Sequence, residues 1–422
     1  MFMFFKKNSI SDKSKLKIAI FHFAFIYSGG GEKLVMEEAV GLAKKGHRVD
    51  VYSSAYSSKL CFPGVYSVKI KTFLPQISTV LPEHDSFQIL LTCVVAPFLA
   101  FKFRSYDVIL AANQPSPWIA FWVRLFFKVP YVSYLAQPTR YIYPRKVDLE
   151  EGLIFSRKRL FSITAKLLEV STPITSYFDK ISIRKSGLVL SNGRYIKQLL
   201  DKTYDIKTIN VPAGTHPAKQ LRDFSKRADG TIKVGKTTIQ KPFILITNRH
   251  FPQKRFEYAL AAMPALLLLN PKIKLVITGS KTFYTDTLKI MIKELSLDDS
   301  VQFVGFVNEQ ELSNLYSNAY IYCYTAPEED FGMGIIEAMG NGVPVVAWDN
   351  SGPKEIIENN KTGLLAHPLE IVDFTKKIEL LLTNRKLAEN ISNLAYSCAV
   401  SDFSYKNHIN LVEEALKKSI TE

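Results

Sequence analysis

Short apolar runs separated by amphipathic stretches recur along the whole chain and predict alternating strands and helices. In the first half, the predicted strands cover residues 17–25, 47–53, 106–110, 129–134 and 188–192. In the second half, they cover residues 243–247, 274–278, 301–306, 319–324 and 343–348. Helical patterns follow most of these strands, and one more covers residues 153–169. Strands that alternate with helices build parallel sheets, so the pattern predicts an α/β protein with two doubly wound sheets.

A polar, lysine-rich stretch over residues 215–241 interrupts this pattern, and we place the boundary between two domains there. A chain of 422 residues is also long for a single core. The predicted organisation is a tail, a Rossmann-like domain, a linker, a second Rossmann-like domain and a C-terminal helix that packs back on the first domain. These parts cover residues 1–15, 16–214, 215–241, 242–400 and 401–422.

Composition indicates which cellular compartment and which classes of partner suit the protein. The chain has 54 Lys and Arg against 39 Asp and Glu, and the resulting charge of +15 favours phosphates or an acidic membrane face, unless lysine is simply abundant throughout. Basic and aromatic residues do not interleave in a stripe, so we expect no nucleic-acid binding. Four widely spaced cysteines without a CxxC pair fit a reducing cytoplasm. Without a D-x-D loop or a His/Cys cluster, we expect no metal and no cofactor.

Two apolar segments, residues 87–103 and 118–127, are too short to span a bilayer, which takes about 20 apolar residues. Both lie near basic residues, so they predict either buried helices or a face that lies on a membrane. The first 15 residues lack the order of a signal peptide and read as a disordered or membrane-touching tail. We therefore expect a cytoplasmic protein with peripheral contact to the inner face of the membrane as an option.

Gly29, Gly30 and Gly31 lie between the first predicted strand and a helix over residues 32–45. A dinucleotide site would show G-x-G-x-x-G and an acidic residue after the second strand, and neither is present. The glycines instead favour close approach of the backbone to a ligand. His22 precedes this loop and is either a core histidine or a residue of the site.

A second strand, glycine loop, helix and strand unit covers residues 319–348. Helix N-termini at the carboxyl ends of parallel strands bind anions, so this unit is a candidate anion site. Its two carboxylates, Glu329 and Glu337, lie around Gly332 with seven residues between them. Upstream, Arg249 and Lys254 follow the strand over residues 243–247 and supply cations.

These spacings resemble those of the retaining GT-B glycosyltransferases of family 4, also called group 1. The pair Glu329 and Glu337 matches the family's E-x7-E motif, and Arg249 with Lys254 matches its R-x4-K spacing. The resemblance is strongest over residues 243–363. In the first half, residues 29–34 and 46–49 are similar to the family's Gly-Gly-x-Glu-Arg and Gly-His-x-Val segments.

The segment from Tyr134 to Tyr141 resembles the Y-x-H-x-P-x-R segment of mannosyltransferases, with Ala136 at the histidine position. The resemblance implies a GT-B fold, two Rossmann-like domains facing across a cleft. It also implies a hexosyltransferase that moves a hexose from a nucleotide-diphosphate sugar to a glycan or lipid-linked acceptor with retention. We take the donor to be GDP-mannose. The implied acceptor-side residues are Gln137, Arg140 and His22.

On the donor side, the resemblance places Arg249 and Lys254 on the diphosphate, Glu337 on the ribose and Glu329 on the transferred sugar. Backbone groups share the donor contacts at Phe331, Gly332, Met333, Gly334, Gly30 and Gly31. No residue stands out as a covalent nucleophile, so we expect front-face departure with the leaving phosphate taking the acceptor proton. Two alternatives remain: a non-catalytic nucleotide-sugar-binding subunit, suggested by Ala136, and a nucleotide-sugar epimerase on the same fold.

Overall fold

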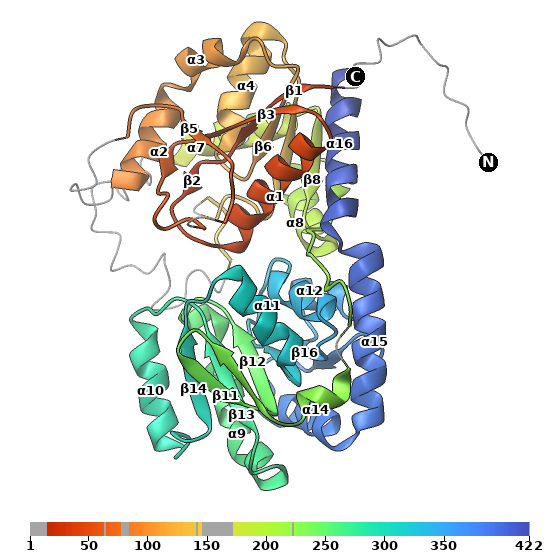
Figure 1. The fold of residues 1–422 in the computed structure, drawn as a ribbon. Coiled ribbons are helices and arrows are strands. Elements are labelled where there is room, and N and C mark those ends of the chain that lie inside the picture. Colours follow the sequence, from red (N-terminus) through yellow and green to blue (C-terminus); the bar gives the residue numbers. More distant parts are fainter. Residues whose placement is uncertain are drawn as a thin grey trace.

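The computed structural model describes residues 15–62, 65–76, 84–140, 142–145, 172–221 and 223–421. It contains two large parallel sheets, one in each half of the chain, with helices around them (Figure 1). The predicted tail up to residue 14, Tyr141 and the predicted helix over residues 153–169 lie outside the described residues.

The first sheet has seven strands in the order β5-β3-β1-β6-β7-β8-β9. Their bounds are β1 Lys17–Phe21, β3 Arg48–Ser53, β5 Ile70–Thr72, β6 Val108–Ala112, β7 Tyr131–Leu135, β8 Leu188–Ser191 and β9 Ile209–Asn210. The predicted strand over residues 17–25 is wrong as one element. After Phe21 the chain leaves the sheet, and β2 (Ala24–Phe25) pairs only with β4 (Ala55–Tyr56).

The second sheet has six strands in the order β14-β13-β12-β15-β16-β17. Their bounds are β12 Phe243–Thr247, β13 Lys274–Thr278, β14 Val301–Gly305, β15 Ile321–Tyr324, β16 Val345–Trp348 and β17 Leu364–Ala366. The polar stretch before β12 contains an antiparallel hairpin, β10 (Thr231–Val234) and β11 (Thr237–Gln240), whose Val234 and Ile239 are buried in the core.

Helices connect the strands. In the first half they are α1 Gly30–Lys44, α2 His84–Val94, α3 Ala96–Leu99, η1 Ala100–Phe103, α4 Ser116–Phe127, α7 Thr172–Arg184 and α8 Arg194–Tyr204. In the second half they are η3 Phe224–Arg227, η4 Pro252–Lys254, α9 Glu257–Leu269, α10 Tyr284–Glu294, α11 Glu309–Asn318, α12 Met333–Gly340, α13 Ser351–Ile356, α14 Ile371–Thr383, α15 Arg385–Asp402 and α16 Tyr405–Thr421. Gly352 and Pro353 lie in the first turn of α13, where proline loses no helical hydrogen bond.

The last helix returns to the first half of the chain. In Figure 1, α15 runs along the second sheet and α16 continues along the first, where it packs against α1, β6 and β7. The two connections between the halves pair at this point: Thr215 N donates to Phe403 O (2.6 Å) and Tyr405 N donates to Thr215 O (3.0 Å). A Cβ on Gly214 would lie 2.7 Å from the Tyr405 Cα, so only glycine lets the two connections approach this closely.

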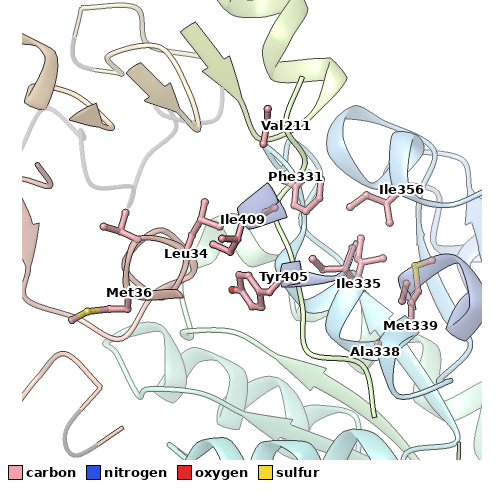
Figure 2. Close-up of a cluster of buried hydrophobic side chains, with 14 of the residues drawn as sticks. Leu34, Met36, Val211, Phe331, Ile335, Ala338, Met339, Ile356, Tyr405 and Ile409 are labelled. Atoms are coloured by element: carbon pink, nitrogen blue, oxygen red, sulfur yellow. The ribbon is translucent and has the colours of Figure 1, made fainter. Parts of the chain in front are cut away.

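One hydrophobic cluster spans both halves (Figure 2). Leu34 comes from α1, Phe331 from the loop before α12, Ile335 from α12, and Tyr405 and Ile409 from α16. All five side chains are buried. Burial of a large apolar side chain contributes about 1.5–3 kcal/mol, so this cluster favours the arrangement in which the two halves are closed against each other.

Candidate active site

Two helix N-termini meet where the halves face each other. Helix α1 begins at Gly30 and α12 begins at Met333, and a Cβ on Gly30 would lie 3.1 Å from the Met333 Cγ. The first N–H groups of a helix have no partner within the helix and carry its positive dipole end. Gly332, which precedes α12, has a φ of +109°, a left-handed conformation that favours glycine. The convergence makes this point of the cleft attractive to an anion.

Glu329 and Lys254 form an ion pair beside these N-termini. Lys254 Nζ donates to Glu329 Oε2 at 2.6 Å, and Thr325 Oγ1 donates to Lys254 O at 2.7 Å, which fixes the backbone of the lysine. Burial opposes ionisation of Glu329, but the charge and hydrogen bond of Lys254, with smaller contributions from Tyr324 and Arg140, lower its pKa to about 2. Glu329 is therefore an anion that can accept hydrogen bonds throughout the physiological pH range.

Arg249 lies between two aromatic rings, with its guanidinium carbon 5.0 Å from the centre of the Tyr27 ring and 5.3 Å from that of Phe251. Tyr27 comes from the first half and Phe251 from the second. Among the residues that the structure describes, Arg249 has no carboxylate partner. Cation–π contacts with the two rings support the guanidinium and leave its N–H groups for an incoming anion.

Glu337 is the fifth residue of α12, and both of its carboxylate oxygens accept a hydrogen bond. Lys33 Nζ donates to Glu337 Oε1 at 2.8 Å, and Tyr316 OH donates to Glu337 Oε2 at 3.1 Å. Tyr322 packs beneath the helix, and its hydroxyl lies 2.2 Å from where a Cβ on Gly334 would be. Glycine at position 334 is therefore required by packing as well as by any approach of a ligand.

Asp330 connects this wall of the cleft to the opposite one. Its Oδ2 accepts from Arg140 Nη2 at 2.8 Å and its Oδ1 accepts from Arg145 Nη1 at 2.7 Å. Arg145 also donates to Glu328 O at 3.3 Å. Two arginines from the first half therefore hold the loop that carries Glu329.

The acceptor-side residues Gln137 and Arg140 line a pocket of about 330 Å³ that follows β7. The full lining is Gln137, Pro138, Arg140, Tyr143, Pro144, Arg145, Leu199 and Thr203. Next to it, Asp179 of α7 accepts from Thr139 Oγ1 (2.7 Å) and Tyr204 OH (2.8 Å). Burial raises the pKa of Asp179 to about 6, because these neutral hydroxyls compensate for it only in part.

Two of the residues expected in the site have buried side chains that contact other parts of the protein. The Phe331 side chain is buried in the shared cluster against Phe403, so a contact with a ligand would have to come from its backbone. His22 is buried at the end of β1, with Nδ1 3.2 Å from Ala112 O and Nε2 4.0 Å from Glu32 Oε1. His22 is thus placed by contacts within the first half of the chain.

Sequence reasoning missed Lys33, Asp330, Arg145 and Tyr316. Lys33 lies within the glycine-rich segment that resembles the family pattern, but nothing in the sequence indicated its partner in α12. Asp330 stands beside Glu329, and only the position of the two arginines distinguishes it from an ordinary loop carboxylate.

The described residues contain no group of three or more His, Cys, Asp or Glu side chains that could hold a metal ion. All four cysteines are free. Across the same residues, no helix has the length and apolarity to cross a bilayer.

Comparisons with known proteins identify the fold and the family. Residues 231–397 match the model for glycosyl transferases group 1, and residues 28–211 match the model for Glycosyltransferase Family 4. A sucrose-phosphate synthase from Thermosynechococcus elongatus superposes with a TM-score of 0.72 at 18% identity, over 94% of this chain and 98% of that one. Anabaena HepE in complex with UDP and glucose superposes with a TM-score of 0.69 at 19% identity, over 95% and 99%. The predicted GT-B fold is confirmed.

Among relatives, the α-1,3/1,6-mannosyltransferase ALG2 of Dictyostelium discoideum is 25% identical over 97% of this chain and 100% of its own length. The enzyme of the same name from Schizosaccharomyces pombe is 25% identical over 85% of this chain and 72% of its own length.

Proposed function

Because this chain belongs to the group 1 glycosyltransferases of family 4, and is thus a hexosyltransferase, we propose that it transfers mannose from GDP-mannose to a glycan or lipid-linked acceptor. The observation that carries the donor half of this proposal is the set of groups at the convergence of α1 and α12. Two helix N-termini meet there, Lys254 pairs with Glu329 in the loop before α12, and Arg249 contacts Tyr27 across the two halves. Together these groups suit a diphosphate that gains charge as it leaves.

In the proposed reaction, the bond between the anomeric carbon and the diphosphate oxygen breaks, and a bond to the acceptor oxygen forms on the same face. The acceptor proton passes to the departing phosphate, so no additional base is needed. Arg249 and Lys254 stabilise the developing negative charge, and a single such donor typically contributes about 2.7–4 kcal/mol. Glu329 accepts hydrogen bonds from the hydroxyls of the sugar, for which its low pKa keeps it ionised.

The choice of mannose rests on relatives that match most of the chain and are named as mannosyltransferases. The segment from Tyr134 to Arg140 supports it as well, although Ala136 replaces the histidine of the pattern. In its place, the backbone N–H of Ala136 donates to Asn113 Oδ1 at 2.9 Å, which orders this part of the acceptor wall. The acceptor enters next to Gln137 and Arg140, in the pocket that they line.

An apolar face on the first half supports an acceptor at a membrane surface. Its exposed side chains, 45–78% accessible, come from η1 and the neighbouring helices α3, α4 and α7. They are Phe98, Phe101, Leu125, Phe126, Ile174 and Tyr177. Ring contacts make the face continuous: Phe101 meets Phe126 (6.1 Å), Trp122 meets Phe178 (6.0 Å), and Phe178 meets Tyr177 (5.8 Å).

Among the described residues of the elements that carry this apolar face, the exposed charges are basic. Exposed basic residues surround it, namely Lys102, Arg104, Arg124, Lys128, Lys180 and Lys185. The only acidic residue on α3, η1, α4 and α7 is Asp179, which is buried. Each basic residue near an anionic bilayer contributes about 1 kcal/mol of attraction, and apolar side chains add insertion into the interface. Since α7 also carries Asp179 of the acceptor wall, docking of this face would bring the acceptor pocket near the membrane.

A panel of nucleotide sugars, supplied with and without membrane extract, tests the donor and the acceptor. We expect turnover with GDP-mannose that depends on the extract and that falls at least a hundredfold in Glu337→Ala. Glu294→Ala, an exposed carboxylate on α10, is the matched control. Equal turnover by wild type and Glu337→Ala on every donor would show that the site is assigned wrongly. Turnover only with another donor would refute mannose, and conversion of the donor without acceptor would favour an epimerase.

Flotation with lipid vesicles tests the apolar face. We expect the protein to float with vesicles that contain phosphatidylserine and to stay below with phosphatidylcholine alone. Combined substitution of Phe98, Phe101 and Leu125 by serine should abolish flotation, whereas Leu268→Ser, 87% exposed on α9, should not. Loss of self-association instead of flotation would mean that a second copy covers this face, which would overturn membrane docking.

A further inference from the structure

Lys33 reaches across the cleft to the carboxylate that we assign to the ribose. It lies in the first turn of α1, and its Nζ donates to Glu337 Oε1 and to Glu309 Oε2, each at 2.8 Å. The lysine side chain is 12% exposed and that of Glu337 16%. The contact therefore joins the two halves in a largely buried place. It differs in this from exposed surface ion pairs, which contribute little to stability.

The two oxygens of Glu337 are fixed from two directions. Lys33 holds Oε1 from the first half, and Tyr316 OH holds Oε2 from α11. The Tyr316 hydroxyl is itself fixed, since it meets Thr247 Oγ1 at 3.0 Å. An ionised carboxylate accepts about four hydrogen bonds, so about two acceptor positions remain for the two hydroxyls of a ribose.

Lys33 is protonated and positively charged. Burial alone would favour its neutral form, but the charges of Glu337 and Glu309 and their hydrogen bonds raise its pKa above the ordinary value. Glu309 supplies a second negative charge, so the ammonium is held between two carboxylates and is not free to follow Glu337 alone. The position of Glu337 is in this way tied to the position of α1.

We propose that Lys33 is a positioning residue, which orients the Glu337 carboxylate for the donor ribose and makes ribose recognition depend on closure of the cleft. This inference rests on the proposed function, in which Glu337 binds the ribose hydroxyls. It predicts that Lys33 contributes to binding of the donor's ribose and not to binding of its diphosphate, although the lysine carries a charge that suits a phosphate.

Calorimetric titration of the full chain with GDP and UDP, each compared with its 2′,3′-dideoxy counterpart, separates these parts. For whichever base binds, Lys33→Met should weaken the ribonucleotide about 10–100-fold, the range expected for loss of a charged hydrogen bond. The dideoxy nucleotide, which has no hydroxyls for Glu337, should bind both proteins equally. Lys33→Arg should restore binding of the ribonucleotide to within about threefold, and the control Lys44→Met, exposed on the same helix, should change nothing.

Three outcomes would overturn the inference or its premise. Equal weakening of both nucleotides would mean that Lys33 contacts the phosphates directly. Unchanged binding of both would mean that its role is structural only. If wild type itself does not distinguish ribose from dideoxyribose, the premise fails, because Glu337 is then not the ribose ligand. Should Lys33→Met not fold, Tyr316→Phe, which frees the other oxygen of Glu337, must reduce the same discrimination.

Discussion

Two carboxylates on opposite walls of the cleft, Glu329 and Asp179, are held in different ways. On the wall of the second sheet, Glu329 is paired with Lys254 and Glu337 with Lys33. On the wall of the first sheet, Asp179 is buried among the hydroxyls of Thr139 and Tyr204. The paired Glu329 has a pKa of about 2, and the unpaired Asp179 has a pKa of about 6.

This difference shows what burial does with and without a cation. Removal from water disfavours both anions, and at Glu329 the charge and hydrogen bond of Lys254 outweigh the effect. Glu329, on the wall that we assign to the donor, therefore keeps its charge across the physiological range. Asp179, on the wall that we assign to the acceptor, instead changes its charge near pH 6.

The largest effect is expected from breaking the pair on the donor wall. Lys254→Met removes a cation from the diphosphate and takes from Glu329 the ammonium that pairs with it, so kcat should fall about 10²–10³-fold. Turnover of the donor by the purified variant measures it. Lys272→Met, an exposed lysine after α9, is the control. A fall of less than about tenfold would show that Lys254 does not act on the leaving group.

The acceptor wall should respond to pH through Asp179. Its pKa is about 6 in the folded protein and about 3.9 in the unfolded chain, so the folded state binds the proton more tightly. This contribution to stability is fully present below about pH 4 and is lost as the pH rises through 6, by an amount on the order of 2–3 kcal/mol.

Urea unfolding at several pH values tests this sign. From pH 4 to pH 7, the free energy of unfolding of Asp179→Asn should rise relative to wild type, since the amide does not ionise. Glu329→Gln should change relative to wild type only below about pH 5, where the low pKa of Glu329 begins to cost stability. If the difference between Asp179→Asn and wild type is the same at every pH, the raised pKa is wrong.

A smaller effect is expected at Arg249, which differs from Lys254 by its planar, multidentate group. Arg249→Lys keeps the charge but loses the fork and the stacking between Tyr27 and Phe251, so kcat/KM for the donor should fall about tenfold. Steady-state kinetics over a range of donor concentrations measures it. Full activity of the lysine variant would mean that charge alone is needed at this position.

The smallest effect is expected where the walls are tied together. Asp330→Asn weakens the contacts of Arg140 and Arg145 without removing either arginine. We expect KM for the acceptor to change about threefold to tenfold, with little change in kcat, because these ion pairs are partly exposed. A large fall in kcat with an unchanged KM would instead place Asp330 in the chemistry of the donor.

The sequence predicted the donor wall better than the acceptor wall for a physical reason. Strands β12 and β13 begin and end at the predicted residues, because their apolar runs are bounded by polar residues, proline or glycine. Glu329 and Glu337 belong to one loop and helix, so their spacing along the chain determines their spacing in space.

The acceptor wall has no such local signal. Thr139, Asp179 and Tyr204 come from three different elements, and only tertiary packing brings them together. The contact of Lys33 with Glu337 joins residues 304 positions apart and depends on how the two halves close. The bend that divides residues 17–25 into two strands was equally invisible, since His22 and Phe23 continue the apolar run.

The packing of α16 on the first sheet also determines the order in which the two halves finish folding during synthesis. His408 of this helix contacts Glu38 of α1 through Nε2 and Oε1, 3.1 Å apart, although 370 residues separate them. At about 5–20 residues per second, a ribosome makes these two partners roughly 20–70 s apart. During that interval the face of the first sheet that receives Val412 and Leu416 lacks this helix, while the second sheet can already be complete. The half of the chain that is synthesised first is therefore the half that finishes folding last.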